Sequence, residues 1–160
     1  MIDGSAFLEA LEASGFSHLV WIPDSHFGKW EAVLASSKFA PIRPCREGEA
    51  VGIAAGLMLA GAHPLVVMQC TGFFEAGDAI RNVVHDMRLP LKIIVGVRSM
   101  MAWFAGKTSD TCPRFAEPIV RTWQIPFTPF VPSSSDSEEL RETLVELHDR
   151  PDAAVILWAE

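Results

Sequence analysis

Three charged residues stand at the start of a segment that otherwise consists of small and apolar residues. Arg46, Glu47 and Glu49 lead into the stretch 50–61, which is built from Ala, Gly, Val, Ile, Leu and Met. An acidic residue in the first turn of a helix stabilises the helix through the positive end of its dipole. A carboxyl group at the edge of an apolar slot has another use, because it can share a proton with a bound ligand. These residues by themselves leave both interpretations open.

The two glutamates of this segment cannot both serve one slot. Positions two residues apart on an α-helix differ in direction by about 200°. For Glu49 we therefore expect the helix-start role. Arg46 precedes the helix and is open to two interpretations, a contact to an anionic ligand or a solvated surface charge.

Other polar residues follow apolar segments that have the length of strands. Asp24, Ser25 and His26 follow residues 18–22, whereas Thr71 and Gly72 follow residues 64–69 and Arg98 follows residues 91–97. Ligands of parallel α/β sheets bind beyond the carboxyl ends of the strands. These residues are thus candidates for a site. A turn held by Asx hydrogen bonds is the alternative for residues 24–26, and a solvated surface charge is the alternative for Arg98.

The elements that must position these residues alternate along the chain. Apolar segments separated by helical ones indicate strands buried on both faces, which is typical of a parallel sheet. We predict a doubly wound α/β fold with a six-stranded parallel sheet, helices on both faces and a single domain over residues 1–160. The mixed segment 98–113 is expected to form a lid or a subunit contact. The predicted strands are residues 18–22, 40–44, 64–69, 91–97, 126–130 and 153–159.

Composition excludes several classes of protein. A net charge of −7 argues against non-specific nucleic-acid binding. The sequence has no uninterrupted apolar run of about 18 residues, so we expect no membrane span. The chain lacks GxGxxG, P-loop and GxSxG motifs. Cys45, Cys70 and Cys112 form no CxxC pair, so we expect free thiols in a reducing cytoplasm and no metal site.

The Glu47 segment resembles a known motif. Glu47 followed by Gly52, Ile53, Ala54 and Gly56 matches the E-x4-G-I-A-x-G pattern of the pyrimidine-binding domain of thiamine-diphosphate enzymes. Residues 22–25, 66–80 and 87–99 are similar to the α subunits of sulfopyruvate decarboxylase and to the N-terminal region of phosphonopyruvate decarboxylase. The resemblance covers nearly the whole chain. Cys70-Thr71 and Phe73-Phe74 depart from the family's usual residues, and this departure bears on the substrate.

The resemblance implies roles for the candidate residues. Glu47 would hydrogen-bond N1′ of the cofactor's aminopyrimidine and so promote the proton loss that activates thiamine diphosphate. The substrate would be a 2-oxo acid with an anionic 3-substituent, such as sulfopyruvate or phosphonopyruvate. By resemblance, the catalytic residues are Glu47, Ser25 and His26; the cofactor-binding residues are Glu47, Pro23, Thr71 and Gly72; and the substrate-binding residues are Asp24, Ser25, Arg46 and Arg98.

The resemblance also implies a partner. The family holds the diphosphate and Mg2+ with a GDG…N motif, whereas the nearest string here is GDA at residues 77–79. We therefore expect a separate β subunit that carries this end of the cofactor, and self-association through the Glu47 helix. Two alternatives stay open: a non-catalytic α/β binding or regulatory module, and a thiamine-diphosphate enzyme subunit that uses another 2-oxo acid or performs carboligation.

Overall fold

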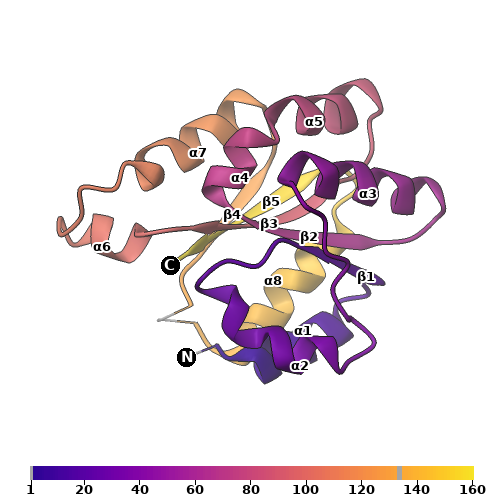
Figure 1. Ribbon diagram of the computed structural model, residues 1–160, viewed down its shortest axis with the longest axis horizontal. Helices are drawn as coiled ribbons and strands as arrows, with labels where there is room; N and C mark the ends of the chain where they lie inside the picture. Colours follow the sequence, from indigo (N-terminus) through magenta and orange to yellow (C-terminus); the bar gives the residue numbers. More distant parts are fainter. Residues whose placement is uncertain (1, 133–134) are drawn as a thin grey trace.

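A five-stranded parallel sheet forms the centre of the molecule (Figure 1). The computed structural model describes residues 2–132 and 135–160. The strands lie in the order β1-β2-β3-β5-β4, and every neighbouring pair is parallel. They are β1 (His18–Trp21), β2 (Pro64–Gln69), β3 (Lys92–Val97), β4 (Phe127–Phe130) and β5 (Ala154–Ala159).

The predicted sixth strand, residues 40–44, is reduced to one bridge. Ile42 pairs with Val20: its N–H donates to Leu19 O (2.9 Å), and its carbonyl accepts from Trp21 N–H (3.0 Å). Pro41 and Pro44 flank this residue and have no N–H to donate, so the ladder cannot continue. The prediction of a parallel α/β sheet is confirmed, with five strands and a bridge in place of six strands.

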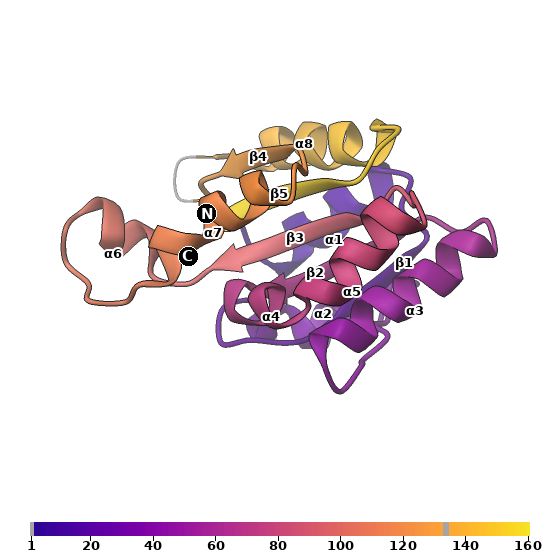
Figure 2. The ribbon, with the colours of Figure 1, turned by 90° about the horizontal axis from the view of Figure 1, so that it is seen from above.

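Helices cover both faces of the sheet, as predicted (Figures 1 and 2). The short α6 extends away from the sheet beyond the end of β3. One face carries α1 (Gly4–Ala13), the 3-10 helix η1 (Phe27–Trp30), α2 (Glu31–Ala35) and α8 (Ser137–Asp149). The other face carries α3 (Glu47–Leu59), α4 (Cys70–Glu75), α5 (Gly77–Arg81), its π-helical continuation η2 (Asn82–Asp86) and α7 (Cys112–Thr122). The helix α6 spans Met100–Phe104. No helix in the described ranges is long and apolar enough to cross a membrane.

Each strand contributes to two cores. Leu19 and Trp21 pack on the side of α1 and α8, whereas Val20 between them packs on the side of α3. All six residues of β3 are buried. Burying one large apolar side chain contributes about 1.5–3 kcal/mol, and a shift of one residue would exchange the two faces of a strand. The apolar pattern therefore fixes the register, and the register aligns the strand ends.

The carboxyl ends of the strands meet at one edge of the sheet. Gln69 pairs with Gly96, and Gly96 pairs with Trp158 on its other side. The residues directly beyond β1, β2, β3 and β5 therefore lie near one another. This edge contains the candidate site.

A disulfide joins two helices beside this edge. Cys70 at the start of α4 is bonded to Cys112 at the start of α7, 42 residues later. The prediction of free thiols is wrong for these two cysteines, because sequence spacing does not show that the two helices begin side by side on one face. Cys45 is free, as predicted, and it is exposed.

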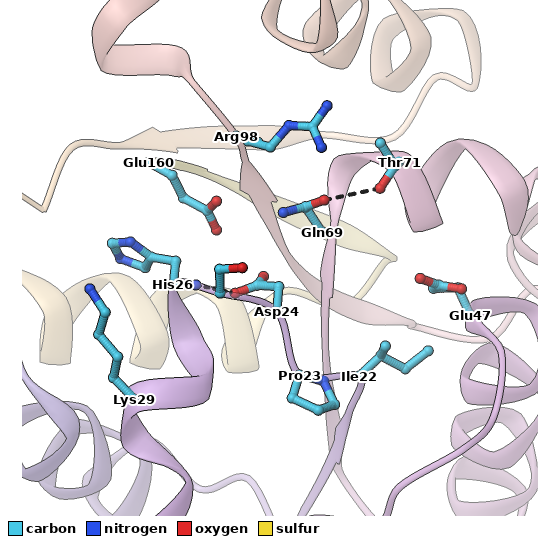
Figure 3. A pocket seen from close by; sticks show the side chains of 11 residues that line it. Ile22, Pro23, Asp24, His26, Lys29, Glu47, Gln69, Thr71, Arg98 and Glu160 are labelled. Carbon is cyan, nitrogen blue, oxygen red and sulfur yellow. Dashed lines mark hydrogen bonds between the residues drawn. The ribbon is translucent and has the colours of Figure 1, made fainter. Parts of the chain in front are cut away.

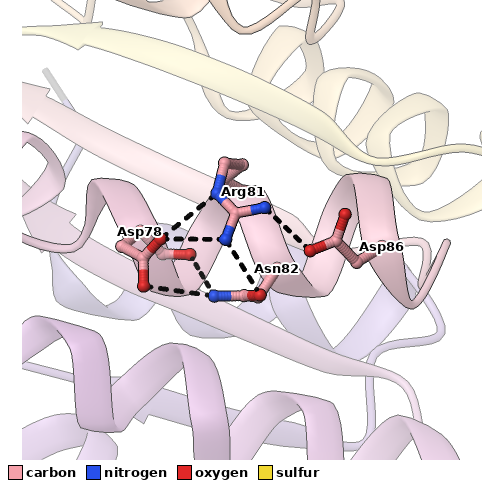
Figure 4. A network of polar contacts seen from close by, with 4 residues as sticks. All are labelled: Asp78, Arg81, Asn82 and Asp86. Carbon is pink, nitrogen blue, oxygen red and sulfur yellow. Dashed lines mark hydrogen bonds and ion pairs between the residues drawn. The ribbon is translucent and has the colours of Figure 1, made fainter.

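The GDA segment lies in an exposed polar network (Figure 4). Arg81 forms ion pairs with Asp78 (3.0 Å) and Asp86 (2.8 Å). Asn82 donates to the Asp78 carboxylate (3.2 Å). Such exposed pairs contribute about 0–1 kcal/mol each. The carboxylate of Asp78 is thus engaged with protein groups of its own helix.

Candidate active site

A cavity of about 500 Å³ opens at the carboxyl edge of the sheet (Figure 3). Most of the residues predicted for the site meet there although they come from separate segments. The lining residues are Ile22, Pro23, Asp24, Ser25, His26, Lys29, Glu47, Gln69, Thr71, Arg98 and Glu160.

Glu47 occupies one end of the cavity. Arg46 has extended backbone geometry, and α3 starts at Glu47. A Cβ atom on the buried Gly72 would overlap the Glu47 side chain, so the position that the Glu47 carboxyl takes here requires glycine at position 72. The carboxyl has no hydrogen bond or ion pair with another described residue, and it faces the cavity (Figure 3). It is therefore available to a ligand.

The two charged neighbours of Glu47 have local roles. Glu49 Oε2 accepts the Cys45 N–H (2.7 Å), which satisfies a free donor before the first helical turn. This hydrogen bond confirms the helix-start role of Glu49. Arg46 is mostly exposed and forms an ion pair with Glu75 of α4. It does not line the cavity, and the structure thus favours the surface-charge interpretation.

Asp24 fits both interpretations considered for residues 24–26, because it forms an Asx turn and also lines the cavity. Its Oδ1 accepts the N–H groups of His26 and Phe27, both at 2.8 Å, which is the Asx turn. Its Oδ2 is buried and has no hydrogen-bond partner among the described residues. Backbone donors therefore hold the carboxyl in place beside the cavity, while its second oxygen is buried without a partner in the described chain.

His26 is held as a neutral base. Its ring packs edge-on against Phe27 (5.3 Å between centroids) and near Trp30 (6.2 Å). This burial lowers the pKa of His26 below the usual value, against the opposing effect of Asp24, and nearby Lys29 lowers it further. The unprotonated imidazole is the dominant form at neutral pH.

Arg98 anchors the segment that leads to α7. Its Nε donates to Asp110 Oδ2 (2.8 Å), and Asp110 Oδ1 accepts the Cys112 N–H (2.9 Å). The bond from Arg98, with help from the Cys112 N–H, lowers the pKa of Asp110 to about 2. The Arg98 guanidinium lies near Gln69 and Thr71 in Figure 3, and its terminal nitrogens make no hydrogen bond with another described residue.

Four lining residues were not predicted: Ile22, Lys29, Gln69 and Glu160. Glu160 directly follows β5, as Asp24 closely follows β1, so the same strand-end rule applied to the last strand would have found it. Its Oε1 is buried with no hydrogen-bond partner in the described chain. Burial raises the pKa of Glu160 to about 7, and the negative charge of Asp24 adds to this shift while Arg98 opposes it.

The aminopyrimidine end and the diphosphate end of a thiamine diphosphate cofactor would need different groups from the protein. An open carboxyl at Glu47 above the glycine at position 72 suits the aminopyrimidine, with Pro23 and Thr71 beside it. Within residues 2–132 and 135–160, no three His, Cys, Asp or Glu side chains are grouped as metal ligands. The described residues therefore fit the pyrimidine end and supply no metal cluster for the diphosphate end.

Comparison with solved structures identifies the fold. The chain superposes over 98% of its length on benzoylformate decarboxylase from Polynucleobacter necessarius (TM-score 0.69, 17% identity). It superposes equally completely on the thiamine diphosphate-dependent 4-hydroxybenzoylformate decarboxylase of Rhodococcus jostii (TM-score 0.64, 16% identity). The fold is that of thiamine-diphosphate-dependent enzymes. The chain covers 29% of each of these larger proteins.

Sequence comparison agrees with this thiamine-diphosphate fold. No protein-family model matches the chain. Over 67 residues, 42% of the chain, it is 34% identical to a sulfopyruvate decarboxylase of Methanosarcina acetivorans, and it covers 17% of that relative's length. The resemblance drawn from the Glu47 motif is thereby confirmed.

Proposed function

We propose that this chain is the pyrimidine-binding part of a thiamine-diphosphate-dependent 2-oxo acid decarboxylase. The observation that carries the proposal is the open carboxyl of Glu47, which faces a strand-end cavity of this fold while Gly72 leaves room for it. Glu49, not Glu47, accepts the Cys45 N–H at the helix start, so the Glu47 carboxyl is not used in a helix-capping hydrogen bond.

The cavity residues would have separate roles in binding the cofactor and the substrate. Glu47 hydrogen-bonds N1′ of the aminopyrimidine and holds the proton that is shared there. Thiamine diphosphate, when bound, supplies the carbon nucleophile and accepts the electrons released with carbon dioxide. Pro23 and Thr71 border the pyrimidine, and Gly72 supports the Glu47 carboxyl. Asp24, Ser25 and His26 are the polar groups on the substrate side of the cavity.

The substrate we propose is a 2-oxo acid with a second anionic group, with sulfopyruvate as the first candidate. Lys29 and the terminal nitrogens of Arg98 are the cationic groups of the cavity, and guanidinium groups suit carboxylate and sulfonate oxygens. Lys29 thus takes the place given to Arg46 from sequence, since Arg46 is paired with Glu75. The partial similarity to a sulfopyruvate decarboxylase supports this choice.

We further propose a partner subunit that holds the diphosphate and Mg2+. The GDA segment departs from the family motif, and Asp78 is engaged with Arg81 and Asn82 (Figure 4). Self-association would use the α3 surface, where Gly52 and Gly56 have open space beside them. A single domain over residues 1–160 and a cytoplasmic location both remain predictions.

The test is reconstitution with the partner. The chain would be co-expressed with the product of a neighbouring reading frame that carries GDG…N. Release of carbon dioxide would then be followed with thiamine diphosphate and Mg2+ on sulfopyruvate, phosphonopyruvate and unsubstituted 2-oxo acids. Turnover that needs both chains and is fastest with an anionic 3-substituent is the expected result. Absence of turnover on every acid, with cofactor bound, would instead support a binding or regulatory module.

A further inference from the structure

Glu160 lies on the side of the cavity opposite Glu47 (Figure 3). Its backbone N–H donates to Val97 O (3.2 Å), and its carbonyl accepts the Met101 N–H (3.0 Å). The residue is therefore fixed between the end of β3 and the start of α6. A Cβ atom on Gly96 would overlap the Glu160 carboxyl, so this glycine leaves space for the side chain beside the ring of Phe27.

Two carboxyl oxygens in this part of the cavity lack partners. Glu160 Oε1 and Asp24 Oδ2 are both buried and make no hydrogen bond to any described residue. An ionised carboxylate only accepts hydrogen bonds, and leaving a buried acceptor unpaired is unfavourable. Asp24 already receives two backbone N–H groups on its other oxygen, whereas Glu160 receives none. Glu160 is therefore the member of the pair that gains from carrying a proton.

No residue in the described ranges forms an ion pair with the Glu160 side chain. Arg98 lowers the pKa of Glu160, but its Nε is bonded to Asp110. His26 is largely neutral, for the reason given above. Burial and Asp24 together raise the pKa of Glu160 to about 7. The titratable and charged groups facing this part of the cavity are Asp24, His26 and Lys29 from the β1–η1 segment, Arg98 after β3 and Glu47 across the cavity.

Resting on the proposed function, we propose that Glu160 is the proton donor of the reaction. It binds substrate as a neutral acid and gives its proton to the substrate carbon that has lost carbon dioxide. The carbon–carbon bond to the departing carboxylate breaks, and the cofactor, when bound, would hold its electron pair. This pair then forms the carbon–hydrogen bond with the proton from Glu160. Glu160 becomes a carboxylate and takes a new proton from solvent. Asp24 acts as a positioning residue whose negative charge favours the protonated form of Glu160.

Neither of the other acid–base groups fills this role as well. Glu47 is at the far end of the cavity, where it is assigned to the pyrimidine. Burial lowers the pKa of His26, which disfavours the protonated form that a donor needs. A neutral acid also avoids adding a negative charge beside an anionic 2-oxo acid.

The protonation state can be measured without turnover. Carbon-13 NMR of the side-chain carboxyls in the intact chain should show one signal that titrates near neutral pH. This signal should be lost in Glu160→Gln and kept in Glu146→Gln, a control on the exposed surface of α8. Glu160 titrating in the ordinary range of glutamates would overturn the proposal whatever the activity of the complex.

The donor role is tested in the reconstituted complex. We expect Glu160→Gln to release carbon dioxide in the first turnover nearly as fast as wild type, but to form aldehyde about 10²-fold more slowly. The fall in the wild-type rate as pH rises through about 7 should disappear in this variant and return in part with Glu160→Asp. Circular dichroism would establish that each variant is folded.

The outcomes separate the two proposals. An active wild-type complex in which Glu160→Gln has the same pH profile and the same ratio of aldehyde to carbon dioxide would refute the donor role alone. A wild-type complex that binds cofactor yet decarboxylates no 2-oxo acid would refute the proposed function, and the donor role with it.

Discussion

The two edges of the central sheet both bury ionisable groups, yet they use them differently. At the carboxyl edge, Glu47, Asp24 and Glu160 each present carboxyl oxygens that no described protein group binds. At the amino edge, the buried Lys92 borders a second cavity of about 330 Å³. Its ammonium donates to Arg150 O (2.6 Å) and to Asp152 O.

This difference separates functional burial from structural burial. Lys92 connects the start of β3 to the backbone that follows α8, so its hydrogen bonds are used within the fold. Next to it, His148 packs edge-on against Phe16 and keeps one nitrogen unpartnered, which makes it an exception at this edge. Carboxyl oxygens that line a cavity or lie buried without a protein partner indicate a site that is completed by a ligand. A buried cation that donates to backbone carbonyls indicates stabilisation of the fold.

The largest expected effect is on catalysis at the carboxyl edge. Glu47→Gln should lower carbon dioxide release by the reconstituted complex about 10²-fold or more, because the amide cannot share a proton with the pyrimidine. The unfolding curve should stay unchanged. The matched control is Glu49→Gln, which should keep turnover within about twofold of wild type, since Glu49 serves the helix start. Equal losses in the two variants would contradict the division of roles.

The next effect concerns the disulfide beside the site. Cys112→Ser should lower the free energy of unfolding by about 2–4 kcal/mol, because the bond restricts the unfolded chain. Urea titrations with and without reductant would measure this effect: reductant should destabilise wild type and leave the variant unaffected. Cys45→Ser, at the free and exposed cysteine, is the control. Three reactive thiols in unreduced, denatured protein would show that the bond does not form.

A smaller effect tests the close contact beneath Glu47. Gly72→Ala should lower the free energy of unfolding by about 1–3 kcal/mol, because its methyl group would overlap the Glu47 carboxyl and force a shift. Gly56→Ala in α3 has open space beside it and should stabilise the chain by up to about 1 kcal/mol. Both values follow from urea titration of the single chain. Equal stability of the two variants would mean that the Gly72 contact is looser than described.

The smallest effect concerns the amino edge. Lys92→Met should lower stability by about 1 kcal/mol by leaving two carbonyls without their donor, and should leave turnover unchanged. Burial lowers the pKa of Lys92 to about 8, so between pH 8 and about 10.5 the unfolded chain binds more protons than the folded one. The free energy of unfolding of the wild-type chain should therefore receive from Lys92 a contribution that rises with pH over this range. Thermal unfolding at several pH values would show whether that contribution is missing from the variant.

Most of the fold could be predicted because its strands are apolar throughout. Five of the six predicted strands form, and helices cover both faces as expected. The exception, residues 40–44, has prolines on both sides of Ile42, and this signal was present in the sequence. The rule that ligands bind beyond the strand ends also predicted a site that includes Asp24, Ser25, His26, Thr71 and Arg98. All five residues line one cavity together with Glu47.

Pairing between side chains could not be predicted in the same way. The ion pair of Arg46 with Glu75 and the bond of Cys70 to Cys112 join residues 29 and 42 positions apart. Both depend on how α3, α4 and α7 pack on one face of the sheet. Lys29 had no predicted role, and only the folded structure shows that this η1 residue lines the cavity.

The amino-acid sequence by itself determined the layers of this protein, the ends of its strands and the glutamate at the start of α3, because these follow from local periodicity and motif. The tertiary structure decided which ionisable groups are left without partners. Strand order places Glu160 beside Gly96 and in the same cavity as Asp24, and burial there changes its proton affinity. Hydrophobic periodicity is a local property of the chain, whereas desolvation and charge pairing depend on neighbours that only the folded sheet brings together.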